Sequence, residues 1–227
     1  MQRVGVANRA NAGPASGIST RLAALAGIAA PLLCGAGFII VAAIRPGYSS
    51  VRQYGSDLAV GPNGWLQTTN FIVFGFLTMI FAFGLQRGIA GRGAAMVGPV
   101  LVAIFGLGWV LVGLFQGELH HDATYLFLAL PTACFIMAPR LDADPKWRAY
   151  VPYTVATGAI AATLGSWWYV NHIRALLPDL TPWIGMYQRV FYAEMLCWLE
   201  VMAIRLFMLS RTPDVARRLA SAAQRQR

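Results

Sequence analysis

Six apolar stretches, each close to the length of a membrane-crossing helix, dominate this chain of 227 residues. A helix of about 20 residues crosses the ~30 Å hydrocarbon core of a bilayer, whereas a strand of a membrane barrel needs only about 10 residues. Hydrophobic residues make up 57% of the chain and charged residues 12%, which is about half the charged share of a soluble domain. We therefore predict an all-α fold, a polytopic transmembrane six-helix bundle over residues 22–210. The predicted spans cover residues 22–44, 65–85, 94–115, 122–138, 150–170 and 185–209.

The distribution of basic residues predicts how these helices thread through the membrane. Of the 18 Lys and Arg residues, 14 fall in segments that share one side when six spans are present, and the other side holds only Arg45, Arg52, Arg174 and Arg189. Because short cytoplasmic loops are enriched in Lys and Arg, we expect both termini in the cytoplasm. The net charge of +9 is then explained by this topology, because basic residues on the cytoplasmic side are attracted to the anionic lipids of the inner leaflet. Nucleic acid is not an expected partner, since the basic tail is short and lacks interleaved aromatic residues.

The two ends of the chain differ in composition from the predicted bundle. Residues 1–21 carry three Arg and no acidic residue, so we expect a disordered basic segment, and residues 211–227 are expected to form a basic cytoplasmic tail. Arg outnumbers Lys by 17 to 1, with abundant Ala and Gly, which is typical of a GC-rich bacterial genome. We therefore expect a multi-pass protein of the bacterial cytoplasmic (inner) membrane, in contact with membrane lipids.

Small residues recur at helical spacing in the fifth predicted span. Thr157, Ala161 and Gly165 repeat every four residues, and a second such set begins at Gly158. Helices in lipid associate through close packing of small residues. These faces are therefore expected to pack within the bundle, against a partner helix or in a homo-oligomer.

The first outer loop, residues 45–64, carries a helix signal. Ser50 is followed three residues later by Gln53, which is a capping-box pattern, and Tyr54 and Leu58 then follow at helical spacing. We predict a short amphipathic helix on the outer leaflet, which either covers loop backbone or acts as a lid over the bundle.

The third loop holds the densest run of titratable residues. Glu118 and His121 are spaced to share one face of a helix, while the rings of His120 and His121 diverge by about 100° and do not readily hold one metal ion together. A single zinc or iron ion could still be bound with help from the fifth loop, the candidate ligands being His120, His121, Asp122 and His172. A solvated polar loop and a role in sensing protons or binding substrate are the alternatives.

The last predicted span contains ionisable residues within an apolar stretch. Such residues are costly at bilayer depth, so they are expected to face the bundle interior and to have partners. At 100° per residue, Tyr187, Glu194 and Trp198 share one face. Arg189 is expected to pair with an outer acidic residue and to hold a phosphate or carboxylate group. The candidate substrate-binding residues are Asp57, Glu118, Asp122, His172, Gln188, Arg189 and Glu194.

Several short motifs resemble those of a known family. They are Tyr48-Ser49, Gly55-Ser56-Asp57-Leu58 before a Gly-Pro pair and Trp65, Asn70 and Gly75, Gly113-x-Phe115, Tyr187-Gln188-Arg189, Trp198, Ala203 and Arg205-Leu206. With these motifs, residues 22–209 resemble the bacterial six-span membrane family catalogued as domain-of-unknown-function 998. The family tends to carry Pro and Asp after the Gly-x-Phe step, where this chain has Gln116-Gly117-Glu118. The resemblance implies a topology and no chemistry.

Three functions are compatible with this sequence. The favoured one is binding or transport of an outer-leaflet lipid headgroup or small polar solute in a pocket of polar outer residues. The second is an accessory membrane subunit whose small-residue faces dock partner helices. The third is a metal-dependent, membrane-embedded lipid hydrolase. The chain lacks the Gly-x-Ser-x-Gly elbow, the Walker loop and the dinucleotide-binding glycines, and no organic cofactor is expected.

Overall fold

The computed structural model describes the backbone of residues 18–89, 96–173 and 181–225 and the side chains of residues 19–89, 96–166 and 182–211. Helices and connecting turns make up this described part of the chain, without a strand, as predicted. The elements are α1 (Ile18–Ile44), η1 (Gly55–Ala59), α2 (Gly64–Gly88), α3 (Val97–Leu114), α4 (Glu118–Thr124), η3 (Tyr125–Leu128), α5 (Ala129–Ala143), η4 (Arg148–Tyr150), α6 (Val151–Ile173), η5 (Thr181–Trp183) and α7 (Ile184–Arg225).

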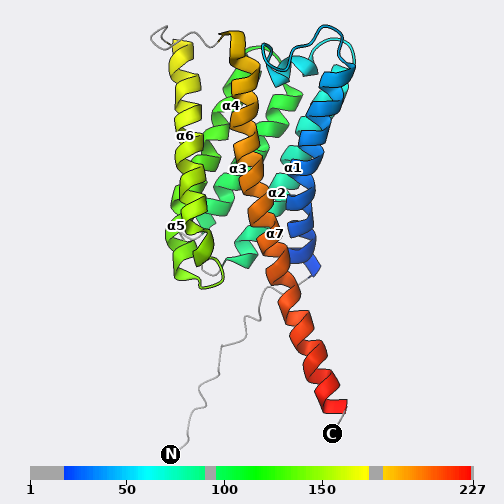
Figure 1. The fold of residues 1–227 in the computed structure, drawn as a ribbon, viewed down its shortest axis with the longest axis vertical. Coiled ribbons are helices and arrows are strands. Elements are labelled where there is room, and N and C mark those ends of the chain that lie inside the picture. Colours follow the sequence, from blue (N-terminus) through cyan, green and yellow to red (C-terminus); the bar gives the residue numbers. More distant parts are fainter. Residues whose placement is uncertain (1–17, 90–95, 174–180, 226–227) are drawn as a thin grey trace, which may run out of the picture.

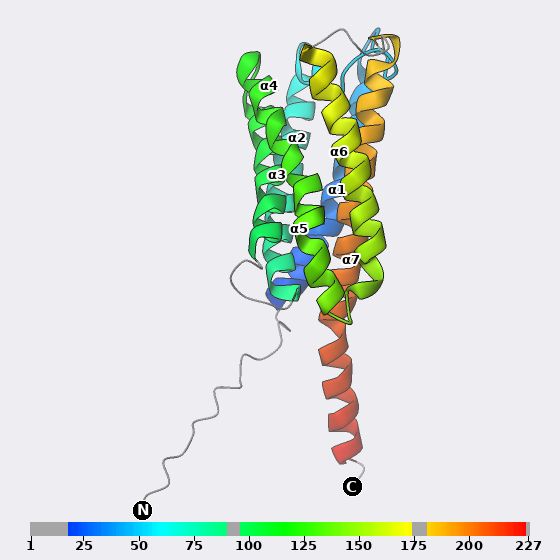
Figure 2. The same cartoon turned by 90° about the vertical axis from the view of Figure 1, so that its left-hand side faces the viewer.

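The long helices stand side by side in one elongated bundle (Figures 1 and 2). Within the bundle, α4, η3 and α5 follow one another end to end and together take the place of one long helix. We call the end that carries the 45–63 segment and the start of α7 the loop end. The opposite end, where α7 extends beyond the other helices, is the tail end (Figure 1). Helix α1 packs against α2 and α7, and α6 packs against α5 and α7.

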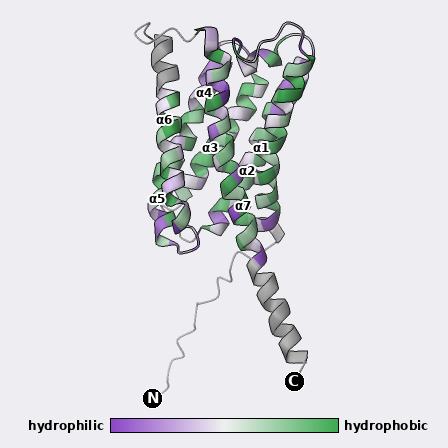
Figure 3. Cartoon of the chain, viewed as in Figure 1, coloured by the Kyte–Doolittle hydropathy of each residue, from purple (hydrophilic) through white to green (hydrophobic). Residues whose placement is uncertain are grey.

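Four stretches of the described chain are long and apolar enough to cross a membrane: Ser19–Ile44, Gly64–Gly88, Val97–Leu114 and Glu118–Ala143. Hydrophobic residues dominate the middle of the bundle, and hydrophilic residues gather at the turn between α5 and α6 (Figure 3). Helices α6 and α7 run alongside these four (Figure 1), but α7 carries Arg189, Glu194 and Glu200 within its apolar stretch. The polar groups on α7 must therefore find partners inside the bundle.

The helix boundaries differ from the predicted spans at three places. Helix α1 begins at Ile18, within the segment expected to be disordered, and residues 1–17 lie outside the described chain. The fourth span is interrupted by the 3-10 segment η3, which ends three residues before Pro131. Proline lacks the N–H that would bond to the carbonyl four residues earlier and its ring crowds that carbonyl. Helix α7 continues through the predicted tail to Arg225.

Small residues let the helices approach closely, as the sequence predicts. A Cβ added to Gly75 on α2 would collide with the Gly106 carbonyl oxygen on α3. A Cβ on Gly158 of α6 would lie 3.0 Å from the Cys134 Cβ on α5. Such contacts leave no space for a larger side chain, and in lipid they provide much of the association energy.

An aromatic cluster fills the bundle between these contacts and the loop end. The Trp109 side chain on α3 is only 1% exposed. Its ring centroid lies 5.3 Å from that of Phe71, 4.9 Å from Phe74, 4.9 Å from Phe127 and 4.8 Å from Tyr192. The tilted and edge-to-face geometries that dominate here are the favoured ones for aromatic pairs. This cluster packs α7 against α3 and lies next to the polar residues of the loop end.

Candidate functional site

The start of α7 is held against the 45–63 segment by backbone contacts. The Met186 N–H donates to the Val51 carbonyl at 3.1 Å, and a Cβ on Gly185 would collide with the Gln53 carbonyl oxygen. One turn further, the Gly55 N–H donates to Gln188 Oε1 at 2.6 Å. Glycine is needed at position 185 because the two backbones approach without space for a side chain.

The predicted amphipathic helix in this segment is wrong. Its only helical part is the 3-10 helix η1, and the Gln53 side chain caps the Ser49 N–H at 2.7 Å, not that of Ser50. Asp57 Oδ2 accepts the Tyr54 N–H at 3.0 Å, so the N-cap of η1 is Tyr54, four residues after the expected N-cap Ser50. The local hydrogen bonds of Gln53 and Asp57 thus compete with a regular helix. Leu58, at 0% exposure, anchors η1 to the bundle.

Arg189 is held by oxygen atoms of the loop and of its own helix. Its Nη1 donates to the Gln53 carbonyl at 3.2 Å and to the Gly185 carbonyl at 2.9 Å, and its Nη2 donates to the Tyr48 hydroxyl. The guanidinium also lies 5.6 Å from the Tyr48 ring centroid, within the range of a cation–π contact. The Tyr48 hydroxyl in turn donates to the Tyr54 carbonyl at 2.8 Å.

The predicted ion pair between Arg189 and an outer carboxylate is wrong. In the described ranges the one ion pair is between Arg148 and Asp142, at 3.5 Å. The hydrogen-bond partners of the guanidinium are carbonyl and hydroxyl oxygens and not a carboxylate, and these oxygens carry no net charge. Two of the five guanidinium N–H groups, on Nε and Nη2, have no hydrogen-bond partner among the described residues. They form one edge of the planar fork that binds carboxylate or phosphate with two hydrogen bonds.

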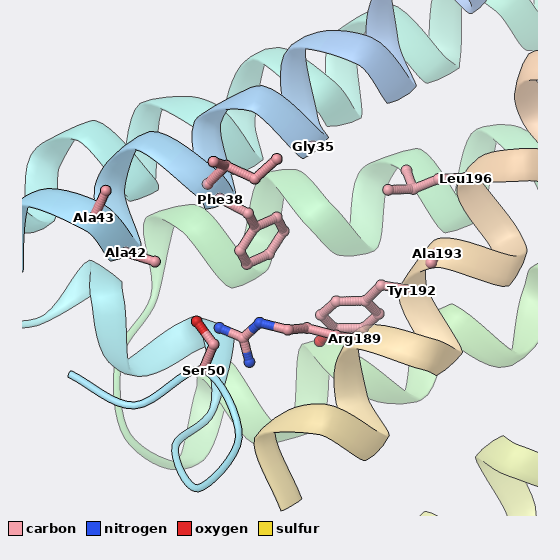
Figure 4. Close-up of a pocket in the computed structure, with 10 residues that line it drawn as sticks. Gly35, Phe38, Ala42, Ala43, Ser50, Arg189, Tyr192, Ala193 and Leu196 are labelled. Carbon is pink, nitrogen blue, oxygen red and sulfur yellow. The ribbon is translucent and has the colours of Figure 1, made fainter.

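A groove of about 560 Å³ lies between α1 and α7, with Arg189 at its loop-end mouth (Figure 4). Figure 4 shows the Phe38 ring on the α1 side of this groove and the Tyr192 ring on the α7 side. The groove opens sideways, since the Ile39 side chain on its wall is 72% exposed. The lining residues are Gly35, Phe38, Ile39, Ala42, Ala43, Ser50, Arg189, Tyr192, Ala193 and Leu196.

Asp57 lies within electrostatic range of Arg189, although the two form no ion pair. Partial burial raises the pKa of the Asp57 carboxyl, while the Tyr54 N–H, His120 and Arg189 act in the opposite direction. Burial likewise raises the pKa of the Tyr48 hydroxyl, and the hydrogen bond from Arg189 lowers it. Asp57, His120 and Arg189 therefore share one electrostatic environment at the loop end.

The other predicted outer residues do not line the groove. Glu118, His121 and Asp122 are exposed on α4, and His120 donates from Nδ1 to the Val112 carbonyl at 3.0 Å, if that nitrogen carries the proton. The rings of His120 and His121 are perpendicular, with centroids 5.9 Å apart.

The metal site stays a prediction. In the described part of the chain, no three His, Cys, Asp or Glu side chains are placed to hold one ion. The backbone of His172 belongs to α6, but its side chain lies outside the described residues. A ligand set that includes His172 therefore remains an expectation.

The predicted common face of Tyr187, Glu194 and Trp198 is confirmed, and it is turned toward α6. The Tyr187 hydroxyl donates to the Leu164 carbonyl, the Glu194 carboxylate accepts from Thr157, and the Trp198 indole N–H donates to the Thr154 hydroxyl at 3.2 Å. Glu194 is therefore not part of the groove, unlike Arg189.

Sequence reasoning missed Tyr48, Phe38 and Tyr192 as parts of this site. Tyr48 belongs to a motif of the family resemblance and precedes the capping-box pattern, so it could have been found as a polar partner of Arg189. Phe38 and Tyr192 read as ordinary apolar residues of two separate spans. Their meeting on either side of the groove depends on the packing of α1 against α7.

The comparisons with known proteins agree with the resemblance. The model of a family described as "Protein of unknown function (DUF998)" matches residues 28–205, well over half of the chain. No curated protein and no solved structure matches the chain.

Proposed function

The chain belongs to the DUF998 family and is an integral membrane protein, and on this premise we propose that it binds an anionic amphiphile of the outer leaflet. The headgroup, a phosphate or a carboxylate, binds to Arg189, and the hydrocarbon chain lies in the groove between α1 and α7. The observation that carries the proposal is the position of the guanidinium at the mouth of an otherwise apolar groove. This is the binding step of the lipid-binding or transport role expected from the sequence.

The proposed orientation places this groove in the outer leaflet. Helices α6 and α7 are proposed to complete six crossings, so that the basic residues of the tail end face the cytoplasm. The 14 Lys and Arg residues of the expected inner side support this sidedness. The loop end then faces outward in the inner membrane of a bacterium, and Arg189 lies about a turn below that surface.

The lining of the groove favours an amphiphile over a small polar solute. Apart from Arg189, Ser50 and the Tyr192 hydroxyl, the lining side chains are apolar. A volume of about 560 Å³ is in the usual range for small-molecule sites. The opening beside Ile39 faces the region where the lipid chains would lie, so an acyl chain could enter sideways.

Arg189 is suited to an anion because its charge is not neutralised. Its contacts are to carbonyl and hydroxyl oxygens, and the edge formed by Nε and Nη2 stays available. Charge-assisted hydrogen bonds contribute about 1.5–3 kcal/mol each, which is enough to select anionic over neutral headgroups. Asp57, which interacts electrostatically with Arg189, already accepts the Tyr54 N–H.

Binding of alkyl phosphate to purified protein in nanodiscs tests the proposal, with an alkylammonium and a neutral alkyl glucoside of the same chain length for comparison. Arg189→Gln should weaken alkyl phosphate binding by about tenfold or more, the loss of roughly 1.4 kcal/mol. The matched control is Arg52→Gln, an exposed arginine of the same loop. Retained glucoside binding shows that the variant groove is intact, and equal alkyl phosphate affinity in the two variants would refute the proposal.

The accessory-subunit role is the second candidate. Among the polar outer residues predicted to converge, Arg189 lines the groove, while Glu118 and His121 are exposed on α4. Such dispersal is expected when a surface docks another protein rather than a ligand. A monodisperse monomer in mild detergent, with nothing co-purifying, would count against this role.

A further inference from the structure

Glu194 is a carboxyl group inside the bundle without a counter-charge. Its Oε2 is buried and has no hydrogen-bond partner among the described residues. The Thr157 hydroxyl on α6 donates to the same carboxylate. The ion pair of the described ranges joins Arg148 and Asp142. No basic side chain in these ranges therefore forms an ion pair with Glu194.

The position of Glu194 along α7 places it near the middle of the proposed bilayer. It lies ten residues from the first residue of the helix, Ile184, or about 15 Å at 1.5 Å per residue. That is about half of the ~30 Å hydrocarbon thickness. An ionised carboxylate at this depth costs at least about 2.5 kcal/mol, and unpaired acids there commonly take part in proton transfer.

A hydrogen-bonded path joins Glu194 to the tail end of the bundle. The Thr157 hydroxyl, which bonds Glu194, also bonds the Tyr153 side chain one turn earlier on α6. Tyr153 is the third residue of α6, at the tail end, and it is partly exposed. The path therefore runs from the bundle interior to the end that we propose to be cytoplasmic.

Among the described side chains, the path does not continue toward the loop end. On the same face of α7, the next polar side chain in that direction is Tyr187, seven residues or about 10 Å away. Its hydroxyl is already bonded to the Leu164 carbonyl, and the buried Phe191 ring lies on the helix between it and Glu194. Among the described side chains, the access to Glu194 is therefore from the tail end.

The described titratable groups around Glu194 are weak acids. Cys134 faces it from α5 and Tyr153 from α6, and Cys197 on α7 interacts with Tyr153. Thiols and phenols are neutral near pH 7. Among the described residues in this part of the bundle, Glu194 is therefore the group whose charge can change.

We propose that Glu194 is a proton-binding site within the membrane, loaded and unloaded from the tail end through Thr157 and Tyr153. One proton enters from water at the tail end, each hydroxyl accepts a proton and passes one on, and the carboxylate becomes a neutral carboxylic acid. Release follows the same path in reverse. The site is separate from the groove between α1 and α7 and does not depend on what binds there.

Infrared difference spectra between two pH values, recorded on the protein in nanodiscs, test whether Glu194 takes up a proton. The wild type should show the C=O band of a protonated carboxyl group, which Glu194→Gln should lack and Glu194→Asp should retain at a shifted frequency. Glu200→Gln, which changes another acid with a buried oxygen on α7, should keep the band. A band in Glu194→Gln with the frequency and intensity of the wild-type band, or a wild type without one, would overturn the proposal.

The rate of hydrogen–deuterium exchange of that band tests the path. Tyr153→Phe and Thr157→Val should slow the exchange severalfold, while Thr163→Val should not, because the Thr163 hydroxyl bonds to a carbonyl of its own helix. Equal exchange rates in all of these variants would overturn the path through α6. An elution volume equal to that of the wild type in size-exclusion chromatography confirms that each variant is folded.

Discussion

The Gln188 side chain joins Gly55, 133 residues away in the sequence, to Tyr192, one turn further along α7. Its Oε1 accepts the Gly55 N–H at 2.6 Å, and its Nε2 donates to the Tyr192 hydroxyl at 3.0 Å. The side chain is 5% exposed, so water cannot readily replace either bond. Through this contact the loop is fixed next to Arg189, and the mouth of the groove has a defined shape.

Gln188→Met should therefore destabilise the loop more than the bundle. The substitution leaves the buried Gly55 N–H without an acceptor, which costs about 1–3 kcal/mol. Thermal unfolding in detergent should show the loss, and hydrogen exchange should show faster exchange of the Gly55 amide. Gln116→Met, at an exposed position of the same end, is the control. Unchanged protection of Gly55 in Gln188→Met would contradict the structural role of this contact.

Binding of an anionic amphiphile should strengthen as the pH falls through the raised pKa of Asp57. Burial raises that pKa above 3.8, so the folded protein holds the proton more tightly than the unfolded chain. The stability from this group is then fully present below pH 3.8 and is lost as the pH rises through the raised pKa. Protonation also removes the negative charge near Arg189, which is worth at most about 1 kcal/mol, or about fivefold in affinity, at an exposed site.

Titration with an alkyl sulfate, which stays ionised across this range, measures the effect without a change in the ligand. Asp57→Asn should bind at neutral pH as the wild type does at low pH, with a flatter pH profile. Glu118→Gln removes an exposed carboxyl group on α4 and should leave the profile unchanged. A profile in Asp57→Asn as steep as that of the wild type would show that another group is responsible.

The long helices could be predicted because the apolar residues alone determine them. The predicted spans 22–44 and 65–85 correspond to α1 and α2, since an apolar stretch of that length in lipid has no stable alternative to a helix. The continuation of α7 to Arg225 was not predicted. It depends on backbone geometry after the apolar residues end, where composition carries less information.

The sequence predicted polar residues of the candidate site but not the contacts that these residues make. Arg189 and Gln188 stood out because polar groups are rare at that depth. The sequence could not show that the Gln53 carbonyl, and not a carboxylate, is the partner of Arg189. Backbone acceptors are present at every residue, so no residue type signals them, and only the approach of Gly185 to the loop places that carbonyl there.

Gly75→Ala should destabilise the contact between α2 and α3. The added Cβ would collide with the Gly106 carbonyl oxygen, and overpacking of this kind costs about 1–3 kcal/mol. Gly35→Ala on α1 is the matched control, because a Cβ there has no neighbour within 4 Å. Thermal unfolding of the two variants in the same detergent compares them. Equal midpoints would mean that α2 and α3 separate at little cost.

The sidedness on which the outer groove and the inner proton path both depend can be measured with single cysteines. After Cys34, Cys134 and Cys197 are replaced by Ala, Ser56→Cys reports on the loop end and Ala143→Cys on the tail end. Because the basic residues favour a cytoplasmic tail end, a membrane-impermeant maleimide added to intact cells should label Ser56→Cys and not Ala143→Cys. Labelling of Ala143→Cys should appear only after the membrane is permeabilised. The reverse pattern would place Arg189 in the inner leaflet and would open the Tyr153 path to the outside.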